Sequence, residues 1–230
     1  MHTIFWAGDS TVQTNDYSTY PQTGIGQVFS LFIKEEYHVK NYAKNGRSTK
    51  SFIDEGRLHK IEEQIGKGDF LFIQFGHNDE KIEDLTRYTE PFSSFIENLE
   101  LFICVARDQG AFPVLITPLE RRIFDENGCL EPSRHEDYAV GMRLAAQRCQ
   151  APLVDLYQMS REALTQAGEQ ESRKWYMYFP EGAYAEHPQE SRDNTHLRYE
   201  GAVLYGSMIA RSLQKMGGIY EQIFRKLQLR

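Results

Sequence analysis

Residues 70–75 read FLFIQF, an apolar run that is followed directly by Gly76-His77-Asn78-Asp79. Such a run is apolar on both faces, as expected for a central parallel strand that helices cover on either side. Further strand-like runs occupy residues 3–7, 38–42, 112–117 and 152–156. Because these runs alternate with helical patterns, they are typical of βαβ units and of a parallel sheet with right-handed crossovers.

Apolar residues at i, i+3, i+4 spacing predict a helix over residues 90–109. Similar patterns predict helices over residues 26–36, 135–149, 158–167 and 199–216. We therefore predict an α/β fold: a single three-layer α/β/α domain over residues 1–230, with a five-stranded parallel sheet in flavodoxin-like order. Residues 118–134 and 169–192 are longer than ordinary connections, and loops of that length are often functional.

Length and composition describe a globular protein of 230 residues, with 40% hydrophobic and 26% charged residues. The net charge of −7 argues against a nucleic-acid partner. No apolar run reaches the roughly 18 residues of a membrane helix, and the amino terminus lacks a signal-peptide pattern. We therefore expect a cytoplasmic protein without a membrane partner. Three scattered cysteines indicate neither disulfides nor a zinc site.

Gly8-Asp9-Ser10-Thr11 follows the first predicted strand. Ligands of open parallel sheets bind beyond the carboxyl ends of the strands, so Ser10 is expected to face a crevice. A serine there can attack a carbonyl carbon if a base takes its proton. The alternative is that Asp9 or Ser10 simply caps the following helix.

Asp193 and His196 precede the last helical pattern. Histidine is the usual base for serine, and a carboxylate can fix its tautomer and stabilise the imidazolium. A three-residue spacing in a turn can place Asp193 beside one ring nitrogen and leave the other for Ser10. The alternative is a helix start capped by Asn194 or Thr195, with an exposed histidine.

Two more polar clusters, residues 45–48 and 76–79, follow the second and third strands. Both are expected at the sheet edge that carries Ser10. The Gly46 N–H and the Asn78 amide, together with the Ser10 N–H, could form a three-donor oxyanion hole. Each cluster alone also fits an ordinary turn, since Asn-Gly and Asn-Asp are turn formers.

The four clusters resemble the four sequence blocks of the SGNH, or GDSL, hydrolases along the length of the chain. The resemblance implies Ser10 as nucleophile, His196 as base and Asp193 as its orienter. It also implies Ser10, Gly46 and Asn78 as oxyanion donors. Within that family the chain looks most like the rhamnogalacturonan acetylesterases, which deacetylate a pectic polysaccharide. The segments that carry this likeness are residues 8–12, 23–27, 45–48, 76–79 and 117–122.

One position departs from those relatives, because Ile25 stands where they usually carry tryptophan. Asp9 and His77 are candidates to support the catalytic residues. Arginines could bind galacturonate carboxylates, and aromatic residues could stack on sugar rings. The alternative is that these arginines are ordinary surface residues and that the aromatic residues fill the core. These substrate-binding candidates are Arg47, Arg121, Arg122, Arg192, Trp175, Tyr176, Tyr178 and Tyr184, whereas His187 is interpreted as a loop histidine.

We therefore expect a serine esterase that needs no metal or cofactor. It would remove acetyl groups from a carbohydrate, with imported rhamnogalacturonan oligosaccharides as the expected substrate. One alternative is an SGNH lipase, thioesterase or lysophospholipase that acts on acyl chains. Another is a non-catalytic carbohydrate-binding protein. The sequence leaves the oligomeric state open.

Overall fold

The computed structural model describes residues 2–131 and 135–225. Within these residues it contains a five-stranded parallel sheet with the strand order β2-β1-β3-β4-β5. The strands are β1 (His2–Gly8), β2 (Tyr37–Asn41), β3 (Phe70–Gln74), β4 (Phe112–Ile116) and β5 (Leu153–Val154). This confirms the predicted α/β class and the flavodoxin-like order.

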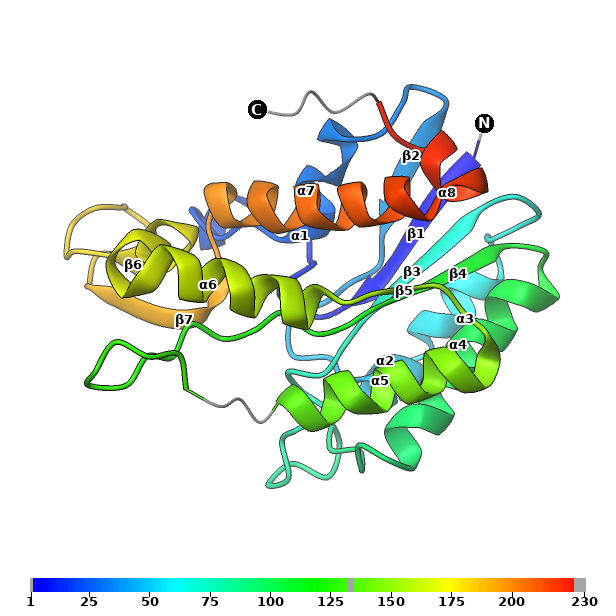
Figure 1. Ribbon diagram of the computed structural model, residues 1–230, viewed down its shortest axis with the longest axis horizontal. Coiled ribbons are helices and arrows are strands. Elements are labelled where there is room, and N and C mark those ends of the chain that lie inside the picture. The colour runs from blue at the N-terminus through cyan, green and yellow to red at the C-terminus, as the bar shows by residue number, and fades with distance from the viewer. Residues whose placement is uncertain (1, 132–134, 226–230) are drawn as a thin grey trace.

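Helices cover both faces of the sheet (Figure 1). One layer contains α1 (Ile25–Val28), α6 (Leu156–Ser172), α7 (Tyr199–Met216) and α8 (Gly218–Gln222). The other contains α2 (Thr49–Asp54), α3 (Arg57–Glu62), α4 (Ser94–Asp108) and α5 (His135–Cys149). Short 3₁₀ turns occur at Tyr17–Thr19, Phe29–Leu31 and Arg173–Trp175.

The FLFIQF run explains why the sheet needs two cores. Along β3, Phe70 and Phe72 pack into the core under α1, α6 and α7. Leu71 and Ile73 pack into the core under α2 to α5. Successive side chains of a strand point to opposite faces, so the four consecutive apolar residues 70–73 bury both of them. The Trp6 ring strengthens the first core through an edge contact with Phe72 at 5.4 Å between ring centroids.

Two predicted elements are less than half as long in the structure, whereas the helix expected over residues 158–167 is longer and forms α6. The helix expected over residues 26–36 ends as α1 at Val28, and a 3₁₀ turn follows. The chain then leaves helical geometry because Ile33 forms an antiparallel bridge with Phe224 before β2 begins. The strand expected over residues 152–156 is only β5, since the Asp155 carboxylate accepts the Gln158 N–H and starts α6.

The long connection at residues 169–192 is not an irregular loop. It contributes β6 (Tyr176–Phe179), which pairs antiparallel with β7 (Ser191–Leu197) as a separate two-stranded sheet. Figure 1 shows this hairpin beyond the main sheet, next to the end of α6 and the start of α7. Residues 118–131 form the other long connection, and 132–134 of that segment lie outside the described residues.

None of the helices in the described ranges is both long and apolar enough to span a bilayer.

Candidate active site

The first polar cluster lies at the carboxyl end of β1, as predicted. Gly8 is the last residue of that strand, and a Cβ there would lie 2.9 Å from the Gln74 carbonyl oxygen. The chain then turns, because the Asp9 carbonyl oxygen accepts a hydrogen bond of 3.0 Å from the Gln13 N–H. Ser10 is in this turn and is only 6% exposed. The turn thus presents the serine hydroxyl at the end of the sheet.

Asp193 and His196 lie in β7, not in a turn before α7. The hairpin pairs Tyr176 with Leu197 and Tyr178 with Arg192. Between these two pairs β6 has one residue, whereas β7 has the four residues 193–196, so this part of β7 bulges out of the pairing. The Asp193 Oδ1 accepts the N–H groups of Thr195 (2.7 Å) and His196 (2.9 Å). The expected local turn therefore exists, but as a bulge in a strand.

The bulge brings three predicted residues together. His196 Nδ1 lies 2.6 Å from Asp193 Oδ2, and His196 Nε2 lies 3.0 Å from Ser10 Oγ. A carboxylate only accepts, so Nδ1–H donates to Asp193, and Nε2 of the neutral ring can accept the serine proton. In this arrangement the imidazole can deprotonate Ser10 while the carboxylate fixes its tautomer.

Electrostatics favour the ionised forms of both partners. Burial disfavours the charged carboxyl of Asp193, but the hydrogen bond and charge of His196 and two backbone N–H groups lower its pKa below the usual value. Burial likewise disfavours the imidazolium of His196, but the hydrogen bond and charge of Asp193 raise the pKa of His196 above the usual value. A proton taken up by His196 is thus stabilised by Asp193.

Gly46 and Asn78 occupy adjoining turns. Gly46 has φ 78°, a left-handed conformation that glycine adopts easily. The Asn78 Nδ2 donates to the Arg47 carbonyl oxygen at 3.2 Å, which joins the two turns. The Lys44 N–H donates to the Gly8 carbonyl oxygen at 3.0 Å, which ties the Gly46 turn to the segment that carries Ser10.

Arg87 is a site residue that the sequence did not indicate. Its Nη1 donates to Asn78 Oδ1 at 3.2 Å, while its Nε donates to Asp84 Oδ2 at 2.6 Å. A guanidinium carries hydrogen-bond donors but no acceptor, so Arg87 can bond only the oxygen of the Asn78 amide. The NH₂ group of Asn78 therefore points away from Arg87. Arg87 lies in a polar loop with no strand or motif next to it, so no sequence signal singles it out.

A second cluster of charged groups lies beside the Ser10 turn. Asp9 is fully buried, its Oδ1 accepts from the N–H and hydroxyl of Thr11, and its Oδ2 lies 3.4 Å from His77 Nδ1. Burial disfavours the charged form of Asp9, but the charge and hydrogen bond of His77 lower its pKa below the usual value. These contacts support the prediction that Asp9 and His77 brace the serine turn.

The cluster continues to Arg121. The His77 ring meets the His135 ring edge-on at 4.2 Å between centroids, and the Arg121 Nε donates to His135 Nε2 at 3.1 Å. Burial, followed by the charge of His77, lowers the pKa of His135 to about 4, so this ring is neutral near pH 7. The Arg121 Nη2 also lies 2.8 Å from Glu80 Oε1. Arg121 is thus engaged with protein groups.

Two predicted substrate-binding residues are buried, and that interpretation is wrong for both. Arg122 is 2% exposed, its Nε donates to Ser172 at 3.0 Å, and its backbone N–H donates to the Asn194 carbonyl oxygen at 2.9 Å. It therefore anchors the bulge from beneath. Tyr176 is fully buried, and its hydroxyl donates to the Glu120 carbonyl oxygen at 3.0 Å, so it offers no ring face to a ligand.

The other candidates are more exposed but already have protein partners. Arg47 pairs with Glu55 and Arg192 with Glu190, each at 2.9 Å. Trp175 is half-buried, with its ring edge-on to Tyr205. The His187 Nε2 lies 3.4 Å from the Thr19 carbonyl oxygen, so this loop histidine bridges to the segment after β1.

Ile25, the position at which the expected family pattern has tryptophan, is fully buried in the core. Its backbone N–H donates to the Thr11 carbonyl oxygen at 2.8 Å, next to the serine turn. The substitution therefore concerns packing under the site. Within the part of the chain that the structure describes, no group of three His, Cys, Asp or Glu side chains is arranged to hold a metal ion.

The chain is similar to known proteins along most of its length. Residues 4–206 match the model of the GDSL-like lipase/acylhydrolase family. The rhamnogalacturonan acetylesterase RhgT of Bacillus subtilis is 39% identical over 214 residues, which is 93% of this chain and 90% of that protein. The probable rhamnogalacturonan acetylesterase YesY of the same organism is 38% identical over 216 residues, which is 93% of each.

Solved structures share the fold of this chain. Protein YxiM of Bacillus subtilis superposes with a TM-score of 0.80 at 25% identity, over 94% of this chain and 57% of that one. An acetylxylan esterase from Geobacillus stearothermophilus has a TM-score of 0.65 at 14% identity, over 92% and 93% of the two chains, which shows the shared fold alone. Because the family model spans most of the chain and two relatives exceed 30% identity, this protein belongs to the GDSL-like lipase/acylhydrolase family of SGNH hydrolases and is a carboxylic ester hydrolase.

Proposed function

We propose that this protein is a serine esterase that removes acetyl groups from rhamnogalacturonan oligosaccharides through an acetyl-enzyme intermediate. The observation that carries the proposal is the continuous chain of contacts from Ser10 Oγ through the His196 ring to Asp193. The names of two relatives with 38–39% identity support the acetylated pectic substrate.

In the first half of the reaction, Ser10 Oγ attacks the acetyl carbonyl carbon while its proton moves to His196 Nε2. The tetrahedral intermediate then collapses, and the bond between the carbonyl carbon and the sugar oxygen breaks. That sugar oxygen leaves as a hydroxyl with the proton from Nε2. Asp193 stabilises the imidazolium between these two transfers.

In the second half, a water molecule attacks the acetyl-enzyme. His196 Nε2 takes one water proton and returns it to Ser10 Oγ as the bond between the carbonyl carbon and Oγ breaks. Acetic acid leaves with the other water proton and loses it to solvent as acetate, and the enzyme regains its starting protonation state. The same base thus serves both halves, as microscopic reversibility requires.

The negative oxygen of each tetrahedral intermediate would be held by the N–H groups of Ser10 and Gly46 and by the Asn78 amide. Preorganised donors of this kind each contribute about 2.7–4 kcal/mol of transition-state stabilisation. Arg87 supports the role of Asn78, because its contact with Oδ1 leaves the NH₂ group to serve as the donor. Asp9 and His77 would hold the serine turn in place.

The test is acetate release from acetylated rhamnogalacturonan oligosaccharides, acetylated xylo-oligosaccharides and simple acetylated sugars. We expect the rhamnogalacturonan fragments to be the best substrates. Ser10→Ala should lower kcat by about 10⁶. The matched control is Ser93→Ala, an exposed serine whose side chain does not cap α4, and it should retain full activity.

Two outcomes would contradict the proposal. A strong preference for octanoyl over acetyl p-nitrophenyl ester would favour a lipase or thioesterase that acts on acyl chains. Unchanged activity of Ser10→Ala would exclude Ser10 as the nucleophile, and no acetate release by the wild type would favour a non-catalytic carbohydrate-binding role.

A further inference from the structure

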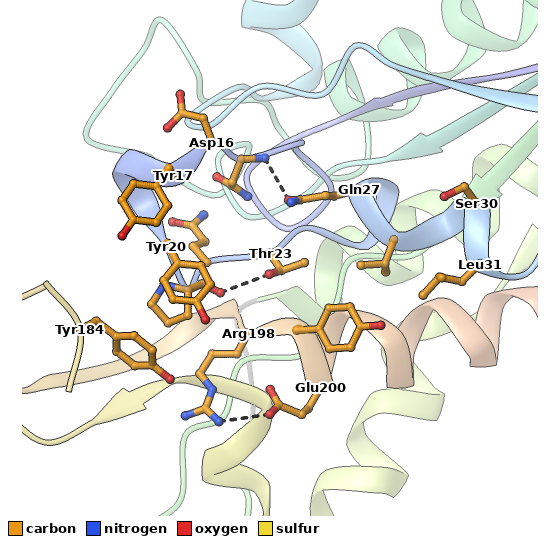
Figure 2. A pocket seen from close by; sticks show the side chains of 15 residues that line it. Asp16, Tyr17, Tyr20, Thr23, Gln27, Ser30, Leu31, Tyr184, Arg198 and Glu200 are labelled. Atoms are coloured by element: carbon orange, nitrogen blue, oxygen red, sulfur yellow. Dashed lines mark hydrogen bonds and ion pairs between the residues drawn. The ribbon is translucent and has the colours of Figure 1, made fainter. Parts of the chain in front are cut away.

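A cavity of about 790 Å³ opens between the segment after β1, the tip of the β6–β7 hairpin and the start of α7. Figure 2 shows the side chains that line it, among them Tyr17, Tyr20, Tyr184, Arg198 and Glu200. Its volume lies within the range of small-molecule sites, about 300–1,000 Å³. The residues that form the Ser10–His196–Asp193 chain do not line it.

A short backbone segment joins the wall of the cavity to the active site. Arg198 lies two residues beyond His196, and the Thr23 N–H donates to the Leu197 carbonyl oxygen at 2.9 Å. Both Thr23 and Arg198 line the cavity. A sugar chain with its acetylated residue at Ser10 would therefore need to pass only this short segment to reach the cavity.

Three tyrosines line the cavity, of which Tyr17 and Tyr20 are exposed and Tyr184 is half-buried. Tyr17 is 73% exposed and Tyr20 is 50% exposed, and their rings stack with 6.1 Å between centroids. Tyr184 meets Tyr20 edge-on at 5.5 Å, so the hairpin and the segment after β1 contribute to one aromatic surface. Clustered exposed aromatic rings are typical of binding surfaces, and their faces suit the C–H face of a sugar ring.

The charges around these rings select against an anionic ligand. The charged lining residues are Asp16, Arg198 and Glu200, and they sum to one negative charge. Among the described residues, the Arg198 guanidinium makes long contacts only, 3.5 Å to Glu200 Oε1 and 3.4 Å to the Tyr178 carbonyl oxygen. Such contacts exchange easily for sugar hydroxyls, whereas a uronate carboxylate would face the two acidic residues.

We propose that this cavity is a second sugar subsite, which binds a neutral sugar ring of the substrate chain next to the residue that is deacetylated. The inference rests on the proposed carbohydrate esterase function and deepens it. It assigns Tyr17, Tyr20 and Tyr184 as the stacking surface and Arg198 and Glu200 as hydroxyl-binding groups.

The test uses Tyr20→Ala and Tyr184→Ala with two probes. The first probe is deacetylated rhamnogalacturonan tetrasaccharide, titrated by calorimetry so that no turnover is needed. We expect each variant to raise its Kd about tenfold, which corresponds to the loss of one central contact residue. The second probe is p-nitrophenyl acetate, which is too small to reach the cavity and should be hydrolysed at the wild-type rate.

Matched variants separate ring stacking from other effects. Tyr20→Phe keeps the ring and should keep most of the affinity. Phe92→Ala removes an exposed aromatic residue outside the cavity and should leave both probes unaffected. Homogalacturonan tetrasaccharide, in which every residue is a uronate, should bind more weakly than the rhamnogalacturonan probe.

Unchanged Kd values for both alanine variants, or no binding of the tetrasaccharide to the wild type, would overturn the subsite. A second contrary result is a lower molecular mass of the variants in light scattering, with unchanged sugar affinity. The tyrosines would then form an interface between two copies of the chain. Acetate release is measured separately. If the wild type releases no acetate from any acetylated oligosaccharide, the proposed function fails, whereas the Kd values still decide the subsite.

Discussion

At the residue scale, the protonation of His196 sets the expected pH dependence of the reaction. Its ring must be neutral to accept the proton of Ser10, so activity falls as the pH falls through the pKa of His196. Burial favours the neutral ring, but Asp193 raises this pKa above the usual value. Loss of the charge on Asp193 therefore moves the acid limb of the profile to lower pH.

Asp193→Asn tests this coupling with little change in size. We expect kcat to fall by about 10⁴, because the ring loses its fixed tautomer and the imidazolium loses its partner. The acid limb of kcat/KM for p-nitrophenyl acetate should also shift to lower pH. Asp54→Asn, at an exposed aspartate, serves as control. An acid limb that stays in place would show that Asp193 does not govern the titration of His196.

Arg87 is a positioning residue, and a single substitution tests its effect on the Asn78 amide. Arg87→Met removes the donor to Asn78 Oδ1, so the amide can rotate and its NH₂ group loses its direction. We expect kcat for p-nitrophenyl acetate to fall about tenfold with little change in KM, since an oxyanion donor acts only in the transition state. Arg87→Lys keeps a donor and should restore part of kcat. Equal loss in both variants would contradict the positioning role.

At the element scale, Asp79 ties the end of β3 to the start of α2. Its Oδ1 accepts the Thr49 N–H at 3.0 Å and the Thr89 hydroxyl at 3.0 Å. Burial nevertheless raises the pKa of Asp79 to about 7, from 3.8 in the unfolded chain. The folded state thus binds more protons between these two values, so this group makes stability fall as the pH rises from about 4 to 7.

Asp79→Asn imitates the protonated carboxyl and should remove this contribution. We expect the free energy of unfolding of the variant, relative to the wild type, to be higher at pH 8 than at pH 4. The size is about 1.4 kcal/mol for each unit of pKa shift that is removed. Urea unfolding at the two pH values measures it, with Asp108→Asn at an exposed position as control. If the difference in free energy of unfolding between variant and wild type is the same at pH 4 and pH 8, Asp79 titrates normally.

The bulge in β7 is the second feature at the element scale, because it allows Asp193 and His196 to meet. In a regular strand, residues three apart point to opposite faces, so Asp193 and His196 could not meet. The bulge removes this restriction, and Arg122 and Tyr178 hold it by hydrogen bonds to the Asn194 side chain. Arg122 stacks on the Tyr178 ring at 4.4 Å from its centroid, so the anchor is itself packed.

At the scale of the whole molecule, the hairpin must dock on the main body for the site to form. Gly201, in the first turn of α7, makes this close approach possible, because a Cβ there would lie 2.1 Å from the Trp175 carbonyl oxygen. The Arg198 N–H donates to the same oxygen at 3.0 Å. The position of Asp193 and His196 relative to Ser10 therefore depends on contacts between α7 and the residue before β6.

Gly201→Ala should push the hairpin away from α7. We expect a loss of about 1–3 kcal/mol in the free energy of unfolding, together with lower esterase activity. Gly66→Ala is the matched control, because a Cβ at Gly66 would meet nothing within 4 Å. Thermal unfolding and p-nitrophenyl acetate hydrolysis measure the two effects. A Gly201→Ala variant with wild-type Tm and activity would contradict the close packing.

The sequence by itself determined the α/β class, since apolar periodicity is a local property of the chain, and the flavodoxin-like strand order was expected as the simplest arrangement of five strands in βαβ units. It also indicated Ser10, Asp193 and His196, because each lies in a short polar cluster next to a regular element. It failed at Tyr176 and Arg122, whose residue types suit either a surface or a buried anchor. It also failed for β5, whose end depends on the cap that Asp155 provides for α6.

The tertiary structure alone decided the rest. The bulge that joins Asp193 to His196 depends on pairing with β6, and the direction of the Asn78 amide depends on Arg87, nine residues further along the chain. The tyrosine cavity joins segments more than 150 residues apart. Contacts of this kind leave no periodic signal in the sequence, because they are set by how the hairpin, the loops and α7 pack around the end of the sheet.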